Sequence, residues 1–99
     1  MSRMTDVGKT AAMHEASLMT NLMRRIDELA KAERARRVIG VSVWLGALSH
    51  MSAEHLAEHF EQAAAGTIAE GARLDVAVSG DTRHANAQDI VLESVEVET

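Results

Sequence analysis

The sequence predicts an α+β fold in which two helices pack on one face of a three-stranded sheet, in the order α-β-α-β-β. Three observations predict it. Two stretches repeat apolar residues at the helical period, three stretches alternate as strands do, and glycine or polar residues mark the boundaries between them. With 99 residues the chain is long enough for one domain and leaves little room for a second.

Residues 1–12 show no apolar period, and we expect a flexible N-terminal extension ahead of a single domain formed by residues 13–99. The first helix is predicted at about residues 14–35, where good helix formers separate the apolar positions. These positions lie on one broad arc at about 100° per residue. The arc consists of Leu18, Met19, Leu22, Met23, Ile26, Leu29 and Ala30.

The period changes to two over residues 38–45, which predicts a strand with one covered face. Odd positions are expected to face the core, and even positions, Trp44 among them, the opposite face. Nothing in the chain obviously covers that second face, so a partner, a homodimer contact, the N-terminal lead and plain partial exposure all stay open for Trp44. The expected inward residues are Ile39, Val41, Val43 and Leu45.

The second helix is predicted at about residues 53–65, after an N-cap at Ser52 and before a stop at Gly66. Its expected inward side chains are Leu56, Phe60, Ala63 and Ala64.

Two further strands are predicted around the polar loop of residues 79–89. The first alternates through Leu74, Val76 and Val78. The second, Ile90–Glu98, changes the parity of its apolar positions near Ser94, which indicates a β-bulge.

Composition excludes several classes of protein. The absence of Cys rules out disulfides, thiolate-bound zinc, iron–sulfur clusters and thiol nucleophiles. The net charge of −5 and the lack of a basic groove with aromatics argue against nucleic-acid binding. The longest apolar stretch, Val38–Leu48, is too short for a membrane helix and no secretory signal precedes it, so we expect a cytoplasmic protein without a membrane partner.

His55-Leu-Ala-Glu58-His59 matches the H-x-x-E-H pattern of some zinc peptidases, and residues four apart on a helix can hold one metal ion. The chain is short for a protease and offers no third ligand at a recognisable spacing. We therefore expect a solvated surface, keep His55 and His59 as secondary metal contacts, and regard a metallohydrolase as the remote alternative.

A more specific signal is the succession of five motifs. Met13-His-Glu-Ala-Ser-Leu is followed by Gly46-Ala-Leu-Ser, by Glu54-x-Leu-x-x-x-Phe60, by Gly66-Thr-Ile-Ala-Glu-Gly-Ala-Arg-Leu-Asp75 and by Ile-Val-Leu-Glu-Ser-Val-Glu-Val-Glu98. From Met13 to Glu98, this order and spacing resemble the HypA family of hydrogenase-maturation nickel chaperones.

The resemblance implies Ni(II) binding by Met13, His14 and Glu15. In that family the Met-His-Glu stretch is the amino terminus, where a free amine, backbone amides and an imidazole can form a square plane around Ni(II). Here twelve residues precede Met13, so its nitrogen is an amide. Either translation starts at Met13, which we favour, or the extension is native and the imidazole acts with Glu15 and other groups.

The resemblance also implies a zinc module, usually two C-x-x-C pairs, between the last two strands. Loop 79–89 occupies that position without any Cys, and His84 alone cannot replace four thiolates. We therefore expect no structural zinc.

Together these features predict a non-enzymatic nickel(II)-binding accessory protein that delivers nickel during [NiFe]-hydrogenase maturation. The resemblance implies two partners, a GTPase of nickel insertion and the hydrogenase large subunit. The alternative is a metal-independent adaptor that kept the docking scaffold and lost nickel transfer.

Overall fold

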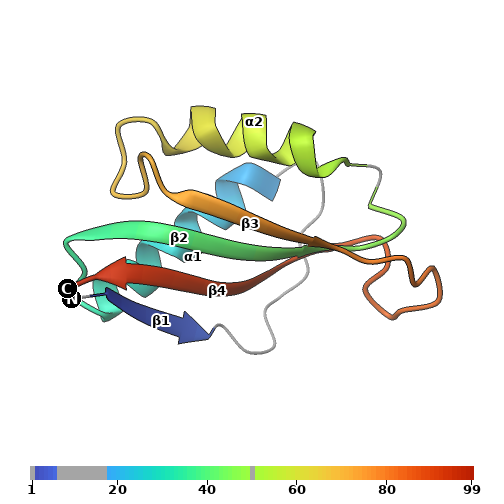
Figure 1. Ribbon diagram of the computed structural model, residues 1–99, viewed down its shortest axis with the longest axis horizontal. Helices are drawn as coiled ribbons and strands as arrows, with labels where there is room; N and C mark the ends of the chain where they lie inside the picture. The colour runs from blue at the N-terminus through green and yellow to red at the C-terminus, as the bar shows by residue number, and fades with distance from the viewer. Residues whose placement is uncertain (1, 7–17, 50) are drawn as a thin grey trace.

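The computed structural model describes residues 2–6, 18–49 and 51–99, with side chains from residue 19 onward. A mixed sheet with the strand order β1-β4-β2-β3 carries both helices on one face. In Figure 1, α1 runs behind β2 and α2 lies along the β3 side of the sheet. The elements are β1 (Ser2–Asp6), α1 (Leu18–Ala32), β2 (Arg37–Leu45), α2 (Ala53–Ala64), β3 (Arg73–Val78) and β4 (Ile90–Glu98).

The predicted α-β-α-β-β order is confirmed, and β1 adds a fourth strand that the sequence did not predict. Strand β1 lies within the segment expected to be a flexible lead and pairs antiparallel with β4, from Ser2 opposite Glu98 to Asp6 opposite Ser94. Its sequence, SRMTD, has no strand-like alternation. The open edge of β4 supplies the hydrogen-bonding partners that stabilise it. The division of the chain at residue 12 stays a prediction.

Helix α1 ends at Ala32, three residues before the predicted end. Arg34 adopts a φ of 53°, in the left-handed region. The amide of Ala35 donates to the carbonyl of Ala30 at 2.9 Å, and the amide of Arg34 donates to that of Lys31 at 3.1 Å. These two bonds form a Schellman motif, which closes the helix although no glycine is present.

Helix α2 begins and ends as predicted. The Ser52 side chain accepts a hydrogen bond from the amide of His55 at 3.1 Å, and Gly66 turns the chain with a φ of 78°. Ala63 is half-buried. The side chains that α2 buries are Leu56, Phe60 and Ala64.

The predicted inward face of β2 is wrong at one position. Val38 is buried in the core, whereas Ile39 is half-buried and does not belong to it. The pairing of β2 with β4 shifts between Val38 and Gly40, so Ile39 is an extra residue and the alternation changes parity there. The predicted bulge near Ser94 is confirmed, because a second shift skips Glu93.

A single aliphatic core joins both helices to β2 and β4. Phe60 is its one aromatic member among the described residues, as the composition required. Trp44 lies half-buried outside this core. Within the described residues, no helix has the length and apolar character needed to cross a bilayer.

Candidate functional site

The predicted nickel residues, Met13, His14 and Glu15, lie outside the described residues. The structure describes the chain again from Leu18, where α1 begins. Helix α1 is fixed on the sheet by Leu22 and Ile26, both fully buried. The helix that follows the Met-His-Glu motif in sequence is therefore a rigidly packed element.

His55 and His59 meet on the exposed surface of α2. Their Nε2 atoms are 2.9 Å apart and their ring centroids 4.5 Å apart. The N-cap at Ser52 sets the first turn of the helix, and the four-residue spacing brings the second imidazole above the first. The structure thus brings together the two side chains that the H-x-x-E-H pattern selected.

The metallohydrolase alternative finds no support in this geometry. Over residues 18–49 and 51–99, no group of three or more His, Asp or Glu side chains is placed to hold one metal ion. A peptidase zinc site needs three protein ligands beside the reacting water. Glu58 is exposed to solvent beside the two histidines.

Trp44 lies on the sheet face opposite the helices, between Ala77 of β3 and Val91 of β4. Its ring contacts His84 of the 79–89 loop, with centroids 4.7 Å apart and planes inclined by 46°. This loop therefore covers part of the face that the sequence left open. Together with Asn86, Val91 and Glu93, the two rings line a shallow pocket of about 200 Å³.

The same sheet face carries a network of exposed charges. Arg73 on β3 donates to Asp75 at 2.8 Å and to Glu96 on β4 at 3.1 Å. Its guanidinium lies across Gly40 of β2, where a Cβ atom would come within 2.6 Å of it. Hydrogen bonds to Asp75 and then to Glu96 raise the pKa of Arg73 above its ordinary value.

Loop 79–89 is closed by its own hydrogen bonds. Asp81 accepts from the amide of Arg83 at 2.9 Å, and the Nδ1 atom of His84 accepts from the amide of Asn86 at 3.0 Å. At its base, the carbonyl of Ala87 accepts from the amide of Leu48 at 2.6 Å. Loop 79–89 is thus held by backbone and side-chain polar groups.

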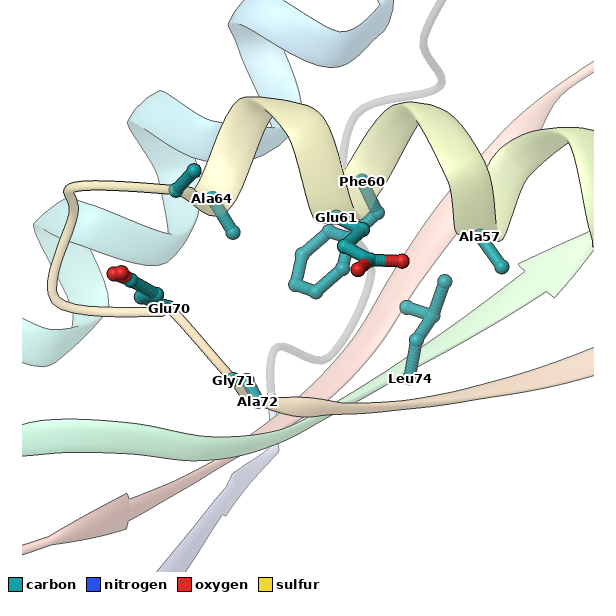
Figure 2. A pocket seen from close by; sticks show the side chains of 9 residues that line it. Ala57, Phe60, Glu61, Ala64, Glu70, Gly71, Ala72 and Leu74 are labelled. Carbon is teal, nitrogen blue, oxygen red and sulfur yellow. The ribbon is translucent and has the colours of Figure 1, made fainter.

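A groove that the sequence did not indicate lies between α2 and the edge strand β3. Figure 2 shows Phe60 and Leu74 facing each other across it, with the carboxylates of Glu61 and Glu70 at its rim. Its volume is about 580 Å³. The small side chains of Ala57 and other alanines leave the space open, and only the packing of helix on strand reveals it.

These features define a class of protein: a small α+β domain with two helices on one face of a mixed sheet, preceded by a Met-His-Glu motif. A family model described as "HypA: Hydrogenase/urease nickel incorporation, metallochaperone, hypA" matches residues 13–96. The chain belongs to the HypA family.

Curated relatives agree with this assignment. The chain is 39% identical over 64 residues to a protein of Chlorobium limicola named hydrogenase maturation factor HypA. It is 38% identical over 66 residues to the protein of that name from Archaeoglobus fulgidus. The matched stretches cover 65% and 67% of this chain but only 55% and 60% of those two proteins.

Solved structures show the same fold. The solution structure of the nickel metallochaperone HypA from Helicobacter pylori matches with a TM-score of 0.72 at 21% identity. The match covers 88% of this chain and 99% of that one. A second solution structure, titled HypA protein, matches with a TM-score of 0.66 at 22% identity.

Proposed function

We propose that this chain is a nickel(II)-binding accessory protein that delivers nickel during [NiFe]-hydrogenase maturation and is not itself an enzyme. The observation that carries the proposal is the span of the family match, which begins at Met13 and so includes the Met-His-Glu motif. The buried packing of α1 supports it, because the motif is followed in sequence by a helix that is fixed on the sheet.

Nickel is the cargo, and its proposed ligands come from Met13, His14 and Glu15. A neutral imidazole nitrogen from His14 is a ligand that suits Ni(II), and a free amine at Met13 would complete fused chelate rings. In the chain of 99 residues that nitrogen is an amide and a weaker donor. The proposal therefore includes a mature form that starts at Met13. An intact mass near 10.7 kDa for protein isolated from its native host would contradict that form.

We further propose that the protein folds without structural zinc. Two observations support this: the sequence has no Cys, and loop 79–89 is closed by hydrogen bonds and by the Trp44–His84 contact. The closed loop supplies locally the cross-links that a metal would otherwise provide.

The proposed setting is the cytoplasm, with two protein partners: a GTPase of nickel insertion and the large subunit of a [NiFe]-hydrogenase. Family membership and the names of the relatives, which are hydrogenase maturation factors, support a role beside a hydrogenase. The GTPase and the large subunit are proposed because the resemblance of the motifs implies them.

Complementation tests this function. In a strain of the native host from which the gene has been deleted, the unmodified chain should restore hydrogenase activity and His14→Ala should not. Gln62→Ala, which removes an exposed side chain of α2 and leaves the motif unchanged, is the control and should restore activity. Full restoration by His14→Ala would contradict nickel delivery and leave the metal-independent adaptor.

A further inference from the structure

We propose that His55 and His59 form a second nickel(II) site on α2, separate from the proposed site at residues 13–15. The observation behind it is the distance of 2.9 Å between their Nε2 atoms on the exposed face of a capped helix. Both imidazoles bind the same ion, and water molecules fill its remaining coordination positions.

The helix holds this pair in place from both sides. Ser52 caps the first turn through the amide of His55 itself, at 3.1 Å. On the opposite face, Leu56 and Phe60 are buried in the core and prevent the helix from rotating. Only the two exposed imidazole side chains can move, so little order has to be gained when a metal binds.

The spacing suits two ligands of one ion. Imidazole nitrogens bind divalent metals at about 2.0–2.1 Å, so two such nitrogens at a right angle on one ion lie about 2.9 Å apart. Square-planar and octahedral ions, Ni(II) among them, bring neighbouring ligands to a right angle. In the metal-free protein the Nε2–H of one ring donates to the Nε2 of the other; when the metal ion binds, the donor ring carries its proton on Nδ1 instead, and both Nε2 lone pairs are free for the ion.

The charge of α2 favours a cation. The helix sequence AEHLAEHFEQAA contains no Lys or Arg, and Glu54, Glu58 and Glu61 are all exposed on it. Their summed field raises the local concentration of divalent cations at the two histidines. Chelation by two imidazoles and attraction by carboxylates thus act on the same helix.

Calorimetric titration with nickel chloride tests this site in the untagged chain of 99 residues. His14→Ala is the background, because it removes the proposed site at residues 13–15. We expect this variant to bind one nickel ion, and we expect His14→Ala/His59→Ala to lose that binding. His14→Ala/Gln62→Ala is the control, since it truncates another exposed side chain of α2 but keeps both imidazoles, and it should keep that binding.

Two results would overturn the second site: no nickel bound by the His14→Ala variant, or binding that survives His59→Ala. Far-UV circular dichroism should be the same for His14→Ala and for the two double variants, because His59 and Gln62 are exposed and their removal leaves the core intact. These results do not decide the proposed delivery function, which has its own test. It would be contradicted if His14→Ala still restored hydrogenase activity in the deletion strain.

Discussion

At the scale of the residue, the contacts on α2 are local ones that the helix itself sets. His55 and His59, four residues apart, bring their rings together, and Ser52 caps the first turn. The inward residue at the start of β2 was not recognisable. Val38 and Ile39 are equally apolar and β-branched, and only the register with β4 decides which one is buried.

Arg34 provides a test at this scale. The backbone of Arg34 lies in the left-handed region, at φ 53°. A Cβ atom is strained in this conformation, whereas glycine adopts it without strain. We expect Arg34→Gly to raise the free energy of unfolding by about 0.5–1 kcal/mol in urea titrations. Arg36→Gly, a nearby exposed control without that conformation, should not stabilise the protein. Equal stability of Arg34→Gly and the parent would contradict the assigned strain.

At the scale of the element, helices and central strands could be predicted from their periods, whereas β1 and the groove beside β3 could not. Strand β1 exists because β4 offers it an open edge, and its own five residues carry no strand pattern. The groove depends on how closely α2 packs on β3, which no sequence period encodes. Both features are products of tertiary packing.

Gly46 and Gly40 are both close to neighbouring elements, but the neighbour of Gly46 is rigid backbone and that of Gly40 is a flexible side chain. A Cβ at Gly46 would collide with backbone atoms of the 79–89 loop, among them the carbonyl carbon of Ala87 at 2.6 Å. At Gly40 it would come closest to the far end of the exposed Arg73 side chain, at 2.6 Å, and it would touch the Glu96 carboxylate at 3.4 Å. We expect Gly46→Ala to cost about 2 kcal/mol or more and Gly40→Ala less than about 1 kcal/mol, measured by urea unfolding. Equal costs would contradict this packing.

At the scale of the whole molecule, the fold class and the family could be predicted, but the nickel site could not be placed. The core draws on α1, α2, β2, β4 and the connector that follows α2, so one domain forms around aliphatic side chains. Residues 13–15 lie outside the described residues, and their role rests on the motif and the family match.

Independence from zinc is a property of the whole molecule. We expect EDTA to leave the thermal unfolding midpoint of the chain unchanged, because the core and the closed 79–89 loop require no metal cross-link. Differential scanning calorimetry with and without the chelator measures this. A midpoint that falls by several degrees in EDTA and recovers with added zinc would contradict a zinc-free fold.

The central claim is that His14 holds nickel, and its most direct test is a nickel titration by calorimetry of four proteins. These are the chain of 99 residues, a version that starts at Met13, and His14→Ala in each. We predict that the tightest binding belongs to the Met13 version, where a free amine is available, and that His14→Ala abolishes this tight component. Nickel affinity that does not change with His14→Ala in either version would contradict the claim.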